Sequence, residues 1–103
     1  MQDRLEALRK MVETRPGDPR ARFGLALELE RLERWKEVVT ELTAYLEMSD
    51  DEGNAFGRLA NALHRLGRTS EAHEIYQRGV DAAYRHGHPT MAAEFEEAME
   101  QLD

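Results

Sequence analysis

Hydrophobic positions recur along this chain at the spacing of α-helices. In the first stretch, about residues 2–14, Leu5, Leu8 and Val12 follow the i, i+3, i+7 pattern that places side chains on one helix face. Five further stretches carry stripes of the same kind, and the alternation typical of β-strands appears nowhere. The pattern predicts an all-α chain of six helices. The second helix is expected from 19 to about 31 or 33 and the last at about 90–102, while the stripes of the third, fourth and fifth run through 35–46, 56–66 and 72–83.

Proline, glycine and short polar residues divide these stretches at places where helices begin and end. Asp18 followed by Pro19 predicts an N-cap with proline at the first helical position. The acidic segment 49–52 is expected to cap the fourth helix, where the helix dipole favours negative charge. Gly67 suits the C-terminal end of that helix. The only two serines, Ser49 and Ser70, are both expected at helix starts as capping residues.

The stripes also repeat at a fixed offset of 34 residues. Leu25 and Leu29 of the second predicted helix become Leu59 and Leu63 of the fourth. The first helix joins the series when the offset is counted backwards, so it corresponds to the second half of an earlier unit. The further pairs are Ala26 and Ala60, Leu32 and Leu66, Arg34 and Arg68, Val38 and Ala72, Leu42 and Tyr76, Leu46 and Val80, Leu42 and Leu8, and Leu46 and Val12.

This repeat resembles the tetratricopeptide repeat, whose unit is two helices in 34 residues. The resemblance is closest from Phe56 to Tyr76, where an aromatic residue, a leucine beside a small residue, the turn glycine Gly67, a small residue and a second aromatic follow the family's order. Pro16 stands where the family places its terminal proline. The resemblance implies a TPR-like α-α superhelix of antiparallel helix pairs. A plain helical bundle is the alternative fold, and an offset kept through both helices argues against it.

Two parts of the chain depart from the family pattern. In the first complete unit, Arg22, Glu33 and Val38 replace an aromatic residue, the turn glycine and a small residue. The last predicted helix is out of phase by about two residues, which we attribute to a longer turn through His86 and His88. We interpret this helix as a cap over the exposed end of the stack. The expected organisation is a single domain, 1–103, with a half repeat at 2–16, repeats at 19–50 and 53–84, and a capping helix at 89–102.

Tetratricopeptide arrays bind peptides or partner helices in a concave groove lined by the first helix of each unit, so the resemblance implies such a groove. Phe23 and Leu27 support it, because they form an apolar pair beside the leucine stripe of their helix. The alternative is that the last helix or a second subunit covers this pair. A clamp of Lys and Asn for a C-terminal carboxylate is not expected, since only Asn61 agrees with it. The implied groove residues are Phe23, Leu27, Glu30 and Arg31 from the first unit, and Gly57, Asn61, His64 and Arg65 from the second.

Composition and charge narrow the function classes. The 103 residues include 21 acidic and 14 basic ones, a formal net charge of −7, which argues against binding nucleic acid phosphates. The absence of cysteine excludes disulfides and thiolate metal sites. No apolar run approaches the roughly 18 residues of a membrane span, and the N-terminus lacks the apolar stretch of a secretory signal. We therefore expect a soluble cytoplasmic protein.

The sequence offers little support for catalysis, cofactors or metals. No phosphate-binding glycine loop and no nucleophile–histidine–carboxylate set is present. His86 and His88, with Glu94 and Glu97 nearby, are a weak metal signal. We predict no catalytic residue, no cofactor and no metal site. The predicted function is a protein–protein interaction module for a peptide or protein segment. The alternative is a homo-oligomerising scaffold, such as a homodimer formed through the apolar pair or an open end of the stack.

Overall fold

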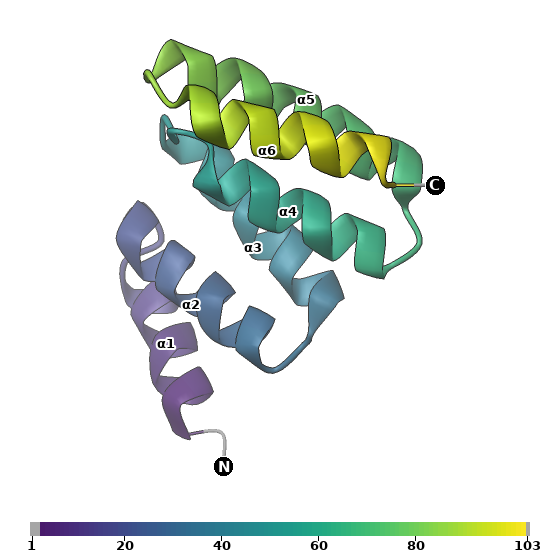
Figure 1. Cartoon of the computed structure of the whole chain (residues 1–103). Coiled ribbons are helices and arrows are strands. Elements are labelled where there is room, and N and C mark those ends of the chain that lie inside the picture. The colour runs from purple at the N-terminus through teal and green to yellow at the C-terminus, as the bar shows by residue number, and fades with distance from the viewer. Residues whose placement is uncertain (1–2, 103) are drawn as a thin grey trace. The chain divides into compact units, whose positions relative to one another are not determined.

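The computed structural model describes residues 3–102, with Asp3 described by its backbone alone. Six α-helices account for most of these residues, and no strand occurs among them, which confirms the all-α fold class. Each predicted helix is present within a few residues of its expected range. The helices are α1 (Asp3–Thr14), α2 (Pro19–Arg31), α3 (Trp35–Met48), α4 (Asn54–Arg65), α5 (Thr69–Arg85) and α6 (Pro89–Glu100) (Figure 1).

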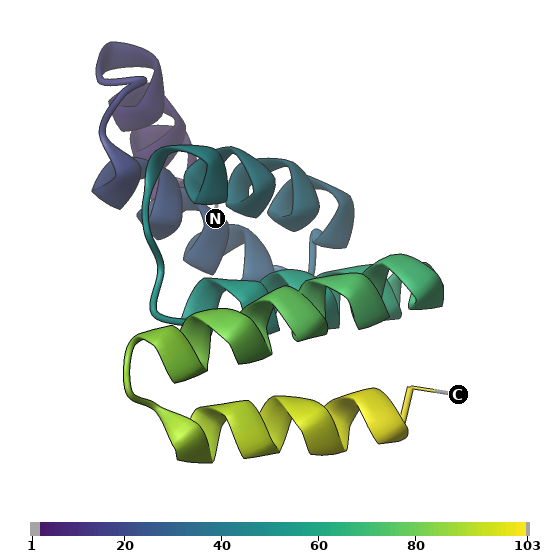
Figure 2. The same ribbon diagram turned by 90° about the horizontal axis from the view of Figure 1, so that it is seen from above.

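The chain divides into two compact units, 1–49 and 50–103. In the first unit α2 packs against both α1 and α3, and in the second α5 packs against both α4 and α6. Figure 2 shows α5 and α6 side by side, joined by a short turn. Each unit therefore contains one helix pair of the predicted repeat and one additional helix. The predicted single domain stays a prediction.

The residues that carry the 34-residue offset form the cores of the two pairs. Leu25 and Leu29 of α2 are buried, as are their counterparts Leu59 and Leu63 of α4. Ala26 and Ala60 are buried as well, which lets the neighbouring helix approach each of them closely. The other buried apolar residues are Leu5, Ala21, Val38 and Leu42 in the first unit, and Ala55, Phe56, Ala62, Ala72, Val80, Ala82, Ala83, Ala92 and Leu102 in the second.

The turn inside each pair has the same hydrogen bonds at the same offset. At the end of α2, the backbone N–H of Arg34 donates to the carbonyl oxygen of Leu29, with an N···O distance of 2.9 Å. At the end of α4, Arg68 donates to Leu63, also at 2.9 Å. This bond spans five residues and is one of the two that define the Schellman motif, which ends a helix on a left-handed residue.

Glu33 and Gly67 occupy the left-handed position of these two turns, with φ values of 57° and 76°. Glycine enters this conformation without the steric cost that a Cβ brings. Glu33, noted in the sequence as a departure from the turn glycine, therefore keeps the glycine conformation. The two turns have the same geometry, and Glu33 costs more conformational free energy in its turn than Gly67 does.

The turn between α5 and α6 belongs to the same type, which corrects one expectation. His88 donates to the carbonyl oxygen of Ala83 at 2.7 Å, and Gly87 is left-handed with φ of 77°. The turn comprises residues 86–88, as many as the turns at 32–34 and 66–68. The expected longer turn is thus wrong, since the corresponding connection between α3 and α4, residues 49–53, is two residues longer. The last helix is shifted because α5 has 17 residues whereas its counterpart α3 has 14, which exceeds the two residues by which the turn is shorter.

Two aspartates cap helix starts, while the serines do not. The side chain of Asp18 accepts the backbone N–H of Arg20 at 2.9 Å, and Pro19 begins α2, as predicted. The buried carboxylate of Asp51 accepts the N–H groups of Gly53 and Ala55 at the start of α4, both at 2.8 Å.

The expectation for the serines was wrong. Ser49 is the C-cap of α3, so it lies at a helix end. At the start of α5, where Ser70 lies, no side chain makes a capping hydrogen bond. Arg68 is the N-cap residue there, because the Schellman turn of α4 leads directly into α5.

Candidate interaction surface

The apolar part of the predicted groove lies on α2, within the first unit. The ring of Phe23 is half-buried and lies 5.0 Å from the ring of Tyr45 on α3, at an interplanar angle of 45°. Leu27, one turn further along α2, is 36% exposed. The aromatic contact holds Phe23 in place, and Leu27 presents an apolar surface next to it. We refer to these two residues as the α2 apolar pair.

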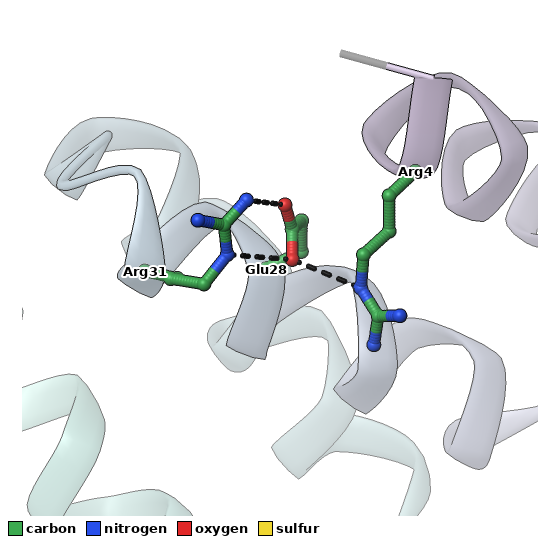
Figure 3. A network of polar contacts seen from close by, with 3 residues as sticks. All are labelled: Arg4, Glu28 and Arg31. Atoms are coloured by element: carbon green, nitrogen blue, oxygen red, sulfur yellow. Dashed lines mark hydrogen bonds and ion pairs between the residues drawn. The ribbon is translucent and has the colours of Figure 1, made fainter. Parts of the chain in front are cut away.

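Arg31 follows the α2 apolar pair by one turn, but its guanidinium already has a carboxylate partner. Both its Nε and its Nη2 donate to Glu28, which is 5% exposed. Glu28 also accepts from Arg4 Nε of α1 at 3.0 Å. Figure 3 shows the carboxylate between the two guanidinium groups. Arg31 therefore contributes first to the packing of its own unit.

The network also perturbs the acid. The hydrogen bonds from Arg31, followed by its charge and that of Arg4, hold the pKa of Glu28 below its usual range, against the opposing effect of burial. The same pair raises the pKa of Arg31. Sequence reasoning did not single out Glu28. Its signal was its position three residues after Leu25 and three before Arg31, on the side of α2 that faces α1.

Further ion pairs join the helices of the first unit. Arg22 on α2 donates to Glu41 on α3 at 2.8 Å, with both side chains largely buried. Arg9 on α1 pairs with Glu37 on α3, and this contact is the main cause of a lowered pKa at Glu37. In the sequence, Arg22 stands where the repeat pattern has an aromatic residue. Its buried pairing with Glu41 explains how a charged residue occupies that place.

The remaining predicted groove residues differ in exposure. Glu30 is half-buried on α2. On α4, in the second unit, Asn61 is half-buried, whereas His64 and Arg65 are exposed in the last turn. With Gly57, four of the eight predicted groove residues belong to the first unit and four to the second, and each set is described within its own unit.

Gly57 stands on α4 at the place that corresponds to Phe23, and there α6 covers the surface. A Cβ on Gly57 would lie 2.7 Å from Cε1 of Phe95. The ring of Phe95 also lies 5.7 Å from that of Tyr76, and its packing partners include Val80 and Ala83. The apolar side of α6 therefore occupies its own unit, which supports the interpretation of α6 as a helix that closes the second repeat.

The side chain of His86 lies beside a carboxylate in the second unit. His86 Nε2 lies 3.2 Å from Asp50 Oδ2, and Arg85 Nη2 lies 3.2 Å from the other oxygen of the same carboxylate. Among residues 3–102, no group of three or more His, Asp or Glu side chains is arranged to hold a metal ion. In the same part of the chain, no helix combines the length and the apolar character needed to cross a membrane.

The fold and its surface define an all-helical protein built on repeated helix pairs, with an accessible apolar pair on one of them. Comparison with protein families makes this specific: the family described as bacterial transcriptional activator domain (BTAD) matches residues 2–86. The chain belongs to this family. The match spans α1 to α5 and ends at the turn before α6. A comparison with curated proteins finds no match.

Proposed function

We propose that this chain is the protein-contacting part of a transcription regulator and that it binds a peptide or protein segment through the exposed face of α2. The single observation that carries the proposal is the α2 apolar pair, in which Tyr45 fixes Phe23 beside the exposed Leu27. A rigid aromatic next to an accessible aliphatic side chain is the composition of an interface anchor. Membership of the activator-domain family supplies the transcriptional context.

The helix pairs are proposed to be tetratricopeptide-type repeats. Three observations support this: the 34-residue offset, the shared burial at the offset positions, and the matching turns at 32–34 and 66–68. In such repeats the first helix of each pair supplies the contact surface. On this basis Glu30 and Arg31 are proposed to border the α2 apolar pair. Asn61, His64 and Arg65 are proposed as polar contacts on α4.

A protein is a better partner than DNA for this surface. The chain carries a net charge of −7, and binding to DNA depends mainly on neutralising phosphates with Lys and Arg. Several arginines that could contribute are already paired within the first unit, as Arg22 is with Glu41 and Arg31 with Glu28. We also propose that the chain acts without catalysis and in the cytoplasm, where transcription regulators meet their partners.

The test is affinity capture from the native lysate with the intact chain and two matched variants. Leu27→Glu adds a charge to the α2 apolar pair. Met48→Glu adds the same charge on α3 at a side chain of similar exposure, 38% against 36%. Far-UV circular dichroism checks that both variants keep their helices. We expect partner proteins that the wild type and Met48→Glu recover equally and that Leu27→Glu loses, with a fall of about tenfold or more for the loss of an anchor.

Two results would overturn the proposal. One is equal recovery of the same proteins by all three chains, which would place the contact elsewhere. The other is binding of a labelled DNA duplex at low salt with no protein partner, in which case the charge argument fails. Sedimentation of the wild type at micromolar concentration tests the alternative function: a dimer abolished by Leu27→Glu would mean that the α2 apolar pair serves self-assembly.

A further inference from the structure

A second surface lies on α1, and it is independent of the α2 apolar pair. The side chain of Met11 is 47% exposed and lines a shallow hollow of about 340 Å³. The residues that line the hollow follow the i, i+3, i+4, i+7, i+8 spacing of a single helix face. They are Ala7, Lys10, Met11, Thr14 and Arg15. We call this set the α1 face.

The repeat indicates what the opposite side of α1 does. Leu8 and its counterpart Tyr76 each contact the helix that follows them in the chain. Leu8 Cδ2 lies 3.6 Å from the position of a Cβ on Gly24 in α2. Its counterpart 68 residues further on, Tyr76 of α5, contacts Phe95 of α6. Thus α1 meets α2 as α5 meets α6, and the register of α1 within the repeat has a structural basis.

In the same register, the α1 face corresponds to the surface that the first helix of each pair covers. The counterpart of Met11 on α3 is Tyr45, which contacts Phe23 of α2 at 5.0 Å between ring centroids. The counterpart on α5 is Gly79, where an added Cβ would lie 2.9 Å from Cβ of Phe56 in α4. In both complete pairs an aromatic residue of the first helix therefore contacts the counterpart of Met11, although Phe23 and Phe56 stand one position apart in the repeat.

Lys10 leads to the same conclusion by a different contact. Its counterpart on α5 is Arg78, whose guanidinium carbon lies 5.3 Å from the centre of the Phe56 ring in a cation–π contact. A ring seated at Met11 would be within the same reach of Lys10. Methionine also suits an aromatic partner, because its polarisable sulfur packs favourably against ring edges.

We infer that the α1 face is a docking site for one amphipathic helix of a partner protein, which supplies an aromatic side chain to Met11 and Lys10 and carries acidic residues at its flanks. The acidic flanks follow from charge, because Lys10 and Arg15 are the charged residues of the α1 face. Helix α6 of a second copy is a poorer occupant, because its exposed side offers glutamates and Ala93 but no large apolar side chain.

The experiment measures binding of a defined peptide to the intact chain. The probe is a fluorescein-labelled synthetic peptide of residues 51–66, which span α4, with Arg58→Glu and Arg65→Glu to make the peptide acidic. A control peptide has Phe56→Ala in addition. The receptors are the wild type, Met11→Glu and the matched variant Met48→Glu, which carries the same substitution at an exposed methionine outside the α1 face. Fluorescence anisotropy gives the dissociation constants.

We expect Met11→Glu to weaken binding of the probe by about tenfold or more and Met48→Glu to leave it unchanged. The control peptide should lose a similar factor, because it lacks the ring. Three results would overturn the inference: no binding of the probe to the wild type at millimolar concentration, equal loss in both methionine variants, or equal binding of both peptides. Self-association of the wild type that Met11→Glu abolishes would also overturn it, since the occupant would be a second copy.

Discussion

The two units share buried leucines at the 34-residue offset, but different side chains pack around these leucines in each unit. In the first unit, ion pairs such as Arg22–Glu41 and Arg4–Glu28 join neighbouring helices. In the second, helices approach over small residues, and the ring of Phe95 lies directly against Gly57 and Gly79. The leucines at the shared offset thus determine the helix pair. The residues between them determine which surface stays accessible, and on the α2 side this is the α2 apolar pair.

The difference in packing between the two units is tested most strongly by adding one methyl group to a helical glycine in each unit. At Gly79 a Cβ would lie 2.9 Å from Phe56 and 3.0 Å from Phe95, whereas at Gly24 it would meet only Leu8 at 3.6 Å. We expect Gly79→Ala to lower the free energy of unfolding by about 1–2 kcal/mol, because the cost of overpacking exceeds the gain in helix propensity. Gly24→Ala should raise it by up to about 1 kcal/mol.

Urea denaturation followed by circular dichroism measures both changes. Gly79→Ala stabilising the chain as much as Gly24→Ala does would show that the second unit is not tightly packed around Phe95. The contrast between the units would then be lost.

The second test removes the side chain from the left-handed position of one turn and adds a methyl group at that position in the other turn. Glu33 holds the left-handed conformation that Gly67 holds in the other repeat. Because a Cβ is unfavourable there, Glu33→Gly should stabilise the chain by about 1 kcal/mol and Gly67→Ala should destabilise it by about the same amount. The shift of the urea midpoint at unchanged slope measures each effect. If Glu33→Gly instead destabilised the chain, Glu33 would have to make a compensating contact in its turn.

The smallest expected effect concerns the pH dependence of the buried acid. The pKa of Glu28 is lowered by Arg31 and Arg4, so its carboxylate stabilises the fold at pH values above the ordinary pKa of 4.5. This contribution is lost as the pH falls through the lowered value. The stability difference between wild type and Glu28→Gln should therefore be constant from neutral pH to about 4.5 and shrink below it.

Glu71→Gln is the matched control in the second unit. Glu71 also has a lowered pKa, caused by its hydrogen bond to Arg68, but this pair lies on one helix and both side chains are about half exposed. The control should change in the same direction by a smaller amount, because solvent screens an exposed pair. A larger effect at Glu71 than at Glu28 would contradict the role given to the buried carboxylate.

The fold was predictable because its signals are local and repeated. The leucines at the 34-residue offset, Asp18 before Pro19, and Gly67 each specify a helix or its end by short-range chemistry. The errors came from turns and pairings. Ser70 suits a helix start by its residue type, yet Arg68 holds the N-cap position, because the Schellman turn of α4 leads directly into α5.

The candidate surface was predictable only in part. The spacing of Phe23 and Leu27 identified an apolar pair, and the structure places Leu27 at the surface. The spacing of Glu28 and Arg31 allowed their pairing, but the burial of Glu28 and its second partner Arg4 depend on α1 packing close by. The α1 face was missed for the opposite reason. Nothing in the sequence separates Met11 from the other apolar residues of its helix. Only the structure shows that its counterparts Tyr45 and Gly79 contact an aromatic residue of a neighbouring helix.

The most direct test of the account is the dissociation constant of the captured partner for two single variants. Leu27→Glu changes the α2 apolar pair, and His64→Ala removes an exposed polar contact proposed on α4. We expect a loss of about tenfold or more for Leu27→Glu, because it would bury an unpaired charge in the contact, and a change of less than about threefold for His64→Ala, because most interface contacts contribute little. A greater loss for His64→Ala, with Leu27→Glu binding like the wild type, would contradict it.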